Sequence, residues 1–198
     1  MKKFGTALIL AGGKSTRMGF DKQLLRINEV KLIDNAISIL KEEFNEIIIS
    51  SNTPELYADA SYKVVKDIIK EKGPLGGIHA GLTASSSKYV YVTACDMPYI
   101  NLEYIRFMKS NIINSKGCIT KYKDSIEPFN GFYSVELIRE IEIYLGENKK
   151  SVRGLLQNAD ITYIEEDEAK KYGANWDMFS NLNTTDDIYE YLSKDIKL

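Results

Sequence analysis

Apolar positions along the chain follow two different periods that alternate from one end towards the other. Continuous apolar runs occur at residues 7–10, 47–49 and 89–94, and such runs are typical of strands that are covered on both faces of a parallel sheet. Between the runs, apolar residues recur every three or four positions, as on one face of a helix. The alternation predicts β-α-β units and therefore an α/β fold.

Three sets of apolar residues have this helical spacing. They are Ile33, Ile37, Leu40 and Phe44; Leu102, Ile105, Met108 and Ile112; and Val135, Ile138, Ile141 and Leu145. Asn101 is the expected N-cap of the second set. The spacing of Thr184 and Asp187 predicts a capping box at the start of a final helix.

Shorter extended segments are expected between these helices. The pattern predicts strands at 62–65 and 118–120, a turn at 121–125 and an extended segment at 127–133. No repeat of 20–50 residues and no convincing linker interrupts the series. We therefore predict a single domain spanning residues 1–198.

Composition narrows the range of partners. The chain of 198 residues is 44% hydrophobic and 27% charged with a net charge of −2, so it has no global field that would attract nucleic acid. No apolar run approaches the roughly 18 residues of a membrane span, and the first strand begins without a signal-peptide pattern. The sequence thus predicts a cytoplasmic protein that binds neither nucleic acid nor membrane.

The chain has few Cys and His residues that could bind a metal or act as a nucleophile. Cys95 and Cys118 form no C-x-x-C pair, and His79 is the only His, which disfavours a zinc site or a Ser-His-Asp triad. We expect all three residues to be buried packing residues. Trp176, the only Trp, is expected to pack beneath a C-terminal loop, with a stacking surface for a ligand as the alternative.

The first strand runs directly into a glycine-rich, cationic loop. Gly12 and Gly13 follow Leu10, and Arg17 and Lys22 come shortly after. Glycines let backbone N–H groups approach an anion, and the cations add charge over the same oxygens, so the loop suits a triphosphate.

Two well-known nucleotide-binding motifs fit this loop poorly. A Walker A motif needs a glycine five positions before Gly13, where this chain has Leu8, and Gly12–Ser15 does not fit G-x-G-x-x-G. The plain structural alternative is a Gly-Gly turn with solvated cations.

Two carboxylates follow predicted strands. Asp67 stands just past the strand at 62–65, and Asp96 just past the strand at 89–94. Ligands of open α/β sheets bind outside the carboxyl ends of the strands, so we expect Asp67 to share one crevice with the Gly12 loop. The Gly73–Gly77 stretch opens the next helix, where a ligand could lie across its entrance.

Five stretches follow one another along the chain: Leu10–Lys22, Asp67 with Gly73–Gly77, Cys95–Pro98, Glu127–Tyr133 and Asn181–Thr184. Taken in this order, they resemble the motifs of the Rossmann-like nucleotidyltransferases, most closely the molybdenum cofactor guanylyltransferases. The resemblance implies a Rossmann-like three-layer sandwich around a mostly parallel sheet, as in the nucleotide-diphospho-sugar transferases. It also implies transfer of GMP from GTP to the phosphate of molybdopterin, with release of pyrophosphate.

The resemblance also implies residue roles. Leu10, Ala11, Gly12 and Gly13 would hold GTP, Arg17 and Lys22 would grip its phosphates, Asp67 would contact the nucleoside, Asp96 would bind GTP and Mg²⁺, and Asn181 and Asn183 would lie on the molybdopterin side. Arg17, Lys22 and Asp96 would be the catalytic residues. No enzyme nucleophile is needed, because the attacking group is already a phosphate oxygen. Proteins that mature molybdenum enzymes are expected as transient partners.

Two stretches depart from the family pattern. Relatives can show asparagine one or two positions before Asn52, so no nucleotide contact is assigned to the segment 50–52, and whether Ser50 or Asn52 contacts the nucleotide stays open. Asn130 is more polar than the usual occupant of its position. Two alternatives therefore stay open. One is a cytidylyltransferase acting on molybdopterin or on a sugar or alcohol phosphate, and the other is a non-catalytic nucleotide-binding regulatory domain.

Overall fold

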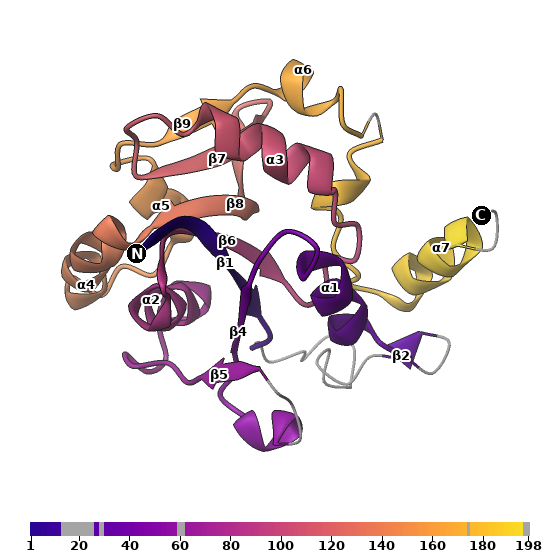
Figure 1. Cartoon of the computed structure of the whole chain (residues 1–198), viewed down its shortest axis with the longest axis horizontal. Coiled ribbons are helices and arrows are strands. Elements are labelled where there is room, and N and C mark those ends of the chain that lie inside the picture. Colours follow the sequence, from indigo (N-terminus) through magenta and orange to yellow (C-terminus); the bar gives the residue numbers. More distant parts are fainter. Residues whose placement is uncertain (13–25, 28–29, 59–61, 174, 196–198) are drawn as a thin grey trace.

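A seven-stranded sheet forms the centre of the protein in a computed structural model that describes residues 1–12, 26–27, 30–58, 62–173 and 175–195 (Figure 1). Its strands are β1 (Lys2–Leu10), β4 (Glu46–Ser50), β5 (Lys63–Val65), β6 (Ser87–Ala94), β7 (Gly117–Tyr122), β8 (Ser125–Ser134) and β9 (Thr162–Ile164). They are arranged in the order β5-β4-β1-β6-β8-β7-β9. A separate antiparallel pair consists of β2 (Arg26–Ile27) and β3 (Val30–Lys31).

Helices connect and cover the strands. They are α1 (Leu32–Leu40), α2 (Pro74–Ala84), α3 (Leu102–Asn111), α4 (Ile138–Gly146), α5 (Val152–Leu156), α6 (Glu166–Ala169) and α7 (Thr185–Asp195). Short 3₁₀ turns are η2 (Pro54–Tyr57), η3 (Val135–Leu137) and η4 (Asp177–Phe179). Within the described ranges, none of these helices is long and apolar enough to cross a membrane.

The sheet is mostly parallel, as expected. Strand β1 is parallel to both β4 and β6, β4 is parallel to β5, and β7 is parallel to β9. Strand β8 is the exception, because it runs antiparallel to both β6 and β7. The β7–β8 turn comprises only residues 123–124, so the expected turn at 121–125 is narrower than predicted, and Lys123 adopts a left-handed φ of 53° there.

Alternate residues of the central strands enter cores on opposite faces of the sheet. Ala7 and Ile9 of β1 join the core beneath α1 and α3, whereas Leu8 and Leu10 join the core beneath α2, α4 and α5. This is the period of two that strand geometry imposes, applied to a strand buried on both faces. The result confirms the three-layer α/β sandwich (Figure 1).

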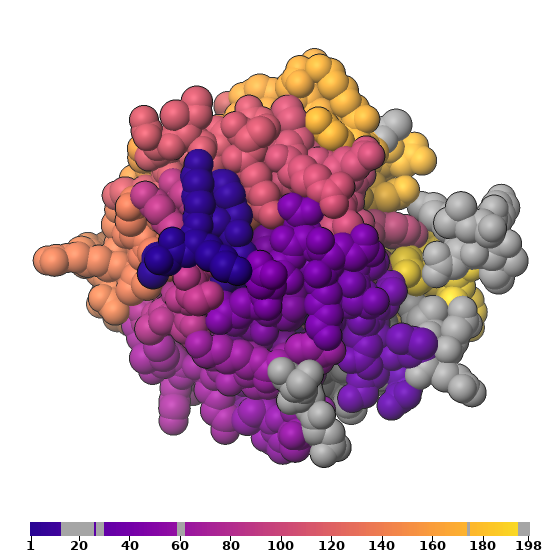
Figure 2. All heavy atoms as spheres, in the orientation of Figure 1, coloured from indigo at the N-terminus to yellow at the C-terminus, as the bar shows by residue number. Residues whose placement is uncertain are grey.

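The amino end of β1 lies at the protein surface. Met1, Lys2 and Lys3 are exposed, and the indigo atoms of this end stand out in the space-filling view (Figure 2). The following residues 5–10 are buried or nearly so. The strand therefore passes through the interior and delivers its carboxyl end, with Gly12, to the opposite edge of the sheet.

The first helix is shorter than its apolar pattern predicts. It ends at Leu40, and Phe44 lies in the turn that follows, where its N–H still donates to the Leu40 carbonyl at 2.9 Å. Phe44 is nevertheless buried and stacks on Tyr91 with ring centroids 5.6 Å apart. The pattern identified the buried residue correctly but extended the helix by one turn.

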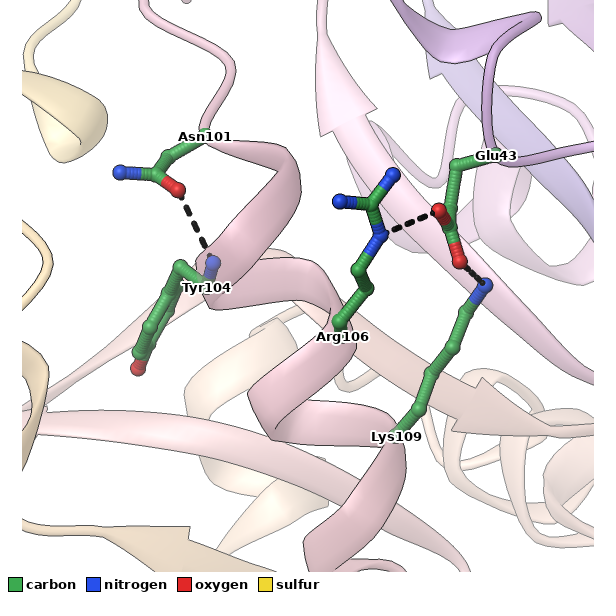
Figure 3. Close-up of polar contacts among 5 residues, drawn as sticks. All are labelled: Glu43, Asn101, Tyr104, Arg106 and Lys109. Carbon is green, nitrogen blue, oxygen red and sulfur yellow. Dashed lines mark hydrogen bonds and ion pairs between the residues drawn. The ribbon is translucent and has the colours of Figure 1, made fainter.

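The turn after α1 is joined to α3 by charged groups (Figure 3). The Glu43 carboxylate accepts from Arg106 Nε at 2.8 Å and from Lys109 Nζ at 2.7 Å. Burial alone would raise the pKa of Glu43, but hydrogen bonds and charge from Lys109 and Arg106 outweigh it, so the pKa lies below its ordinary value. At the start of α3, Asn101 Oδ1 accepts from the Tyr104 N–H at 2.9 Å, which confirms the expected N-cap.

Glu43→Gln is expected to lower the free energy of unfolding at neutral pH by about 1 kcal/mol, since it weakens two charge-assisted hydrogen bonds. For a chain of this size the melting temperature should fall by roughly 2–4 °C. A carboxylate with a lowered folded pKa stabilises the fold above its unfolded pKa and loses this contribution as pH falls through the folded value. Melting curves of the two proteins should therefore converge as acid is added.

The exposed neighbour Glu42 supplies the control, because Glu42→Gln makes the same chemical change next to this cluster. Its melting temperature should stay close to that of the unmodified protein across the same pH range. A gap between Glu43→Gln and the unmodified protein that stayed constant into acid would contradict the assignment.

Candidate active site

The carboxyl ends of four parallel strands are aligned at one edge of the sheet. Their last residues are in register across the order β5-β4-β1-β6, as Val65, Ser50, Leu10 and Ala94. Backbone hydrogen bonds extend the ladder one residue further: Ser51 N–H to Val65 O at 2.9 Å, Ala11 N–H to Ser50 O at 2.9 Å, and Cys95 N–H to Leu10 O at 3.0 Å. The alignment therefore persists beyond the strands.

Two residues past the end of each of these strands stands an exposed or partly exposed residue. These residues form a row in the order Asp67, Asn52, Gly12, Asp96, which we call the terminal row. Neighbouring strands lie about 4.8 Å apart, so the row spans roughly 14 Å at the strand ends. Asp67 and Asp96 thus stand on the two sides of Gly12, at the edge where ligands of α/β sheets bind.

Asp67 is held by its neighbour in the terminal row. Asn52 Nδ2 donates to Asp67 Oδ2 at 3.0 Å, and the Asp67 N–H donates back to Asn52 Oδ1 at 3.2 Å. This reciprocal pair orients the Asp67 carboxylate. No role for Asn52 was predicted from the sequence. It nevertheless stands two residues beyond β4, just as Asp67 stands two residues beyond β5.

The start of helix α2 packs directly against this edge. A Cβ on Gly76 would lie 3.3 Å from the Asp67 carboxyl carbon, and a Cβ on Gly77 would lie 2.7 Å from Ser50 Oγ. Only glycine lets the helix approach so closely without displacing these groups. The Gly-Pro-Leu-Gly-Gly stretch therefore brings the first turn of α2 beside Asp67.

A loop from the C-terminal part of the chain approaches the other end of the row. The Leu182 N–H donates to the Asp96 backbone carbonyl at 2.9 Å, and Leu182 itself is buried. Its neighbours Asn181 and Asn183 are exposed. The predicted Asn181 and Asn183 therefore flank the residue whose backbone bonds to Asp96.

The expected capping box at α7 fixes the end of this loop. Asp187 Oδ2 accepts from the N–H groups of Asn183 and Thr184, both at 2.7 Å, and the Asp187 N–H donates to Thr184 Oγ1 at 3.2 Å. The reciprocal geometry confirms the prediction. Asn183 is therefore held at its backbone by the helix that follows it.

Three predicted site residues, Gly13, Arg17 and Lys22, lie outside the described residues. Of the neighbouring positions, Leu10 and Ala11 are buried and Gly12 is exposed. The Leu10 carbonyl and the Ala11 N–H are used within the sheet. Gly12 is therefore the exposed residue among the described part of this loop.

The donor set of the row suits a cation that takes few protein ligands. In the part of the chain that the structure describes, no three His, Cys, Asp or Glu side chains converge on one point. A cation here would thus be held by one or two protein carboxylate oxygens together with ligand and water oxygens. Asp96, which is partly exposed at the end of β6, fits that arrangement, and Mg²⁺ is the common ion that accepts it.

The remaining candidate groups are packing residues. His79 is 3% exposed within α2, and its Nε2 lies 3.2 Å from Glu142 Oε1 of α4. Both cysteines are buried, and burial raises the pKa of the Cys118 thiol to about 12, so this thiol stays protonated. The interpretation of these residues as structural is confirmed.

Trp176 also packs within the protein. Its ring lies against Tyr122 at 4.7 Å and against Phe179 at 4.8 Å between centroids. These rings belong to β7 and η4, and Trp176 stands just before the loop that carries Asn181.

Comparison with known proteins adds three findings. The profile of the MobA-like NTP transferase domain matches residues 7–163. A probable molybdenum cofactor guanylyltransferase of Peptoclostridium acidaminophilum is 49% identical over 197 residues, covering 96% of this chain and 89% of that protein. A molybdenum cofactor guanylyltransferase of Syntrophotalea carbinolica is 49% identical over 191 residues, covering 96% and 91%.

Solved structures share the fold. Molybdopterin-guanine dinucleotide biosynthesis protein A from Archaeoglobus fulgidus superposes with a TM-score of 0.85 at 21% identity, covering 98% of this chain and 100% of that one. The 4-diphosphocytidyl-2C-methyl-D-erythritol synthase of Anaerococcus prevotii superposes with a TM-score of 0.67 at 16% identity, covering 99% and 97%. At these identities the superpositions establish the fold alone.

Proposed function

The chain belongs to the molybdenum cofactor guanylyltransferases, a family of nucleotidyltransferases, and we propose that it transfers GMP from GTP to the terminal phosphate of molybdopterin and releases pyrophosphate. The observation that carries the proposal is the terminal row, in which Asp67 and Asp96 flank Gly12 at the ligand-binding edge of the sheet. A nucleotide lying along this row has its base near Asp67 and its phosphates near Gly12 and Asp96. Residues 1–198 would act as one domain, since strands from Lys2 to Ile164 share one sheet.

On the base side, the Asp67 carboxylate would accept hydrogen bonds from N1–H and N2–H₂ of guanine. An ionised carboxylate has about four lone-pair sites, so the bond from Asn52 leaves capacity for a base. Because Asn52 fixes the orientation of this carboxylate, little ordering is needed when the base binds. Cytosine presents a different pattern of donors and acceptors and would leave these groups poorly paired.

On the phosphate side, the backbone of Gly12 and Gly13 would contact the triphosphate, with Leu10 and Ala11 forming the rigid strand end behind them. Arg17 and Lys22 would neutralise the phosphates. Transfer of a nucleotidyl group needs the acceptor oxygen in line with the leaving pyrophosphate, together with stabilisation of negative charge. These cations supply that stabilisation without a covalent enzyme intermediate.

Asp96 would hold Mg²⁺ together with phosphate and water oxygens, and the ion would supply further charge neutralisation at the phosphates. The chain's own contribution is to fix this carboxylate. Met97 N–H donates to the Ala94 carbonyl at 3.1 Å, and Leu182 N–H donates to the Asp96 carbonyl, so the backbone is held on both sides of the side chain.

On the acceptor side, Asn181 and Asn183 would contact molybdopterin. Their loop meets Asp96 at the end of the row where we place the reacting phosphates. Amide side chains suit a polar pterin, which presents both donors and acceptors. The proposal also places the reaction in the cytoplasm, where GTP is available, with transfer of the product to proteins that mature molybdenum enzymes.

GTP should support transfer with a kcat/KM at least about tenfold above that for CTP or ATP, since a site built on hydrogen bonds to one base rejects a base that leaves them unpaired. Pyrophosphate release measured with each nucleotide, with and without molybdopterin, provides the test. Equal turnover of CTP would support the cytidylyltransferase alternative. Binding of GTP without any turnover would support the non-catalytic alternative.

A further inference from the structure

Strand β8 leaves the regular ladder at Asn130. The register with β7 pairs Thr120 with Glu127 but Cys118 with Phe132, so β8 contains extra residues between these pairs. Within this bulge Asn130 has a φ of 61°, in the left-handed region. Asparagine tolerates this conformation better than most residues with a Cβ. The bulge therefore re-aims one side chain without ending the strand.

The Asn130 side chain is buried and satisfied from two sides. Asn130 is 2% exposed; its Oδ1 accepts from the Tyr91 hydroxyl, and its Nδ2 donates to the Met178 carbonyl at 2.8 Å. Tyr91 is fully buried in β6, and burial raises its pKa, so the hydroxyl stays protonated and donates. The amide thus connects the central sheet to η4.

The segment after η4 is the loop that carries Asn181 and Asn183. Together with η4 it is held to the sheet at two backbone points: the Met178 carbonyl of η4 accepts from Asn130 of β8, and the Leu182 N–H donates to the Asp96 carbonyl just past β6. These points lie on either side of Asn181. Met178 and Leu182 are buried, whereas Asn181 is exposed. Both fixed points therefore determine where Asn181 stands relative to Asp96.

We propose that Asn130 is a positioning residue for the acceptor substrate, which sets the 177–183 loop beside Asp96 so that Asn181 and Asn183 meet the pterin. The inference rests on the proposed function. It assigns a role to the position where the chain departs from its family pattern. Of the elements on the GTP side, the Asn130 side chain forms a hydrogen bond only with β6, at Tyr91, five residues before Asp96, and with none of β1, β4, β5 or the start of α2 in the described structure. Loss of Asn130 should thus affect one substrate and spare the other.

Asn130→Gly is the informative variant, because glycine accepts the left-handed φ and removes both side-chain hydrogen bonds. We expect the KM for molybdopterin to rise at least about tenfold, while the KM for GTP and the dissociation constant of GTP with Mg²⁺ stay within about twofold of those of the unmodified protein. Without any ligand, hydrogen exchange at the Leu182 amide should also become faster.

Asn148→Gly is the matched control, since Asn148 also has a left-handed φ of 59° and a side-chain bond, from Lys72, but is exposed and far along the chain from the loop. It should change neither KM. Tyr91→Phe removes one of the two Asn130 contacts, leaves the bond to Met178 in place, and should raise the KM for molybdopterin about threefold. This milder variant keeps the test valid if Asn130→Gly fails to fold.

The outcomes separate the possible failures. The first possible result is that the unmodified protein turns over while Asn130→Gly and Tyr91→Phe both keep its KM for molybdopterin. This result overturns the positioning role and leaves the proposed function intact. An equal rise in both KM values also overturns it, because it indicates general loss of structure. Absence of turnover in the unmodified protein refutes the proposed function itself, whereas exchange at Leu182 still reports whether Asn130 anchors the loop.

Discussion

Asp96→Asn is expected to lower GMP transfer by about a hundredfold or more, in line with the loss of a key electrostatic group at a reacting phosphate. Asparagine keeps the shape of the side chain but removes the charge that attracts a hard cation. The fold should be spared, because the contact from Leu182 goes to the backbone carbonyl of residue 96 and does not involve the side chain. The C-terminal loop therefore stays in place in the variant.

Rates measured over a range of Mg²⁺ concentrations, together with the melting temperature in the absence of nucleotide, provide the test. Asp124→Asn is the control, since it makes the same change in the exposed β7–β8 turn, where asparagine serves as well as aspartate. Both variants should melt close to the unmodified protein. Near-normal transfer by Asp96→Asn at ordinary Mg²⁺ concentration would refute the assignment of Asp96 as a Mg²⁺ ligand.

Lys22→Met should also reduce transfer by about a hundredfold. The change keeps the length of the side chain and removes the charge that we place over the triphosphate. Lys22 lies outside the described residues, so this expectation depends on the sequence motif and on the place of Gly12, the last described residue before it, in the terminal row. Arg17→Ala is expected to act in the same direction.

Lys14→Met provides the comparison within the same loop. It removes an equal charge from a position to which the motif gives no role, so we expect at most about a tenfold loss from the weaker general field. Circular dichroism should be native for both variants. If Lys14→Met and Lys22→Met lost activity equally, the loop would act through total charge alone, and the specific role of Lys22 would be refuted.

Periodicity in the sequence was sufficient to predict β-α-β units and an α/β fold, whereas the three-layer arrangement was implied by the family resemblance. Continuous apolar runs located the central strands, and apolar residues repeated every three or four positions located α1, α3 and α4. Local signals were also reliable, because capping is decided by residues close together in the chain: Asn101 and the Thr184–Asp187 pair behave as predicted. The error at Phe44 arose because a buried residue after a helix continues the helical pattern when the backbone no longer does.

Contacts between distant segments were harder to predict. The insertion of β8 between β6 and β7 depends on which sheet edges are available, and no local pattern records that. The bulge at Asn130 was equally hidden, since only the paired strands reveal the extra residues. The Asn52–Asp67 pair required knowledge of the register between β4 and β5, although both residues stand at the same distance from their strand ends.

The link between Leu182 and Asp96 has a consequence for how this architecture changes over evolution. It joins two backbone groups, so it makes no demand on either side chain, and among the standard residues only proline at position 182 would remove the donor. The loop also begins after the last strand of the sheet has ended at Ile164. Its exposed residues can therefore be exchanged without rebuilding the nucleotide side, so the choice of acceptor can change while the nucleotide side stays the same.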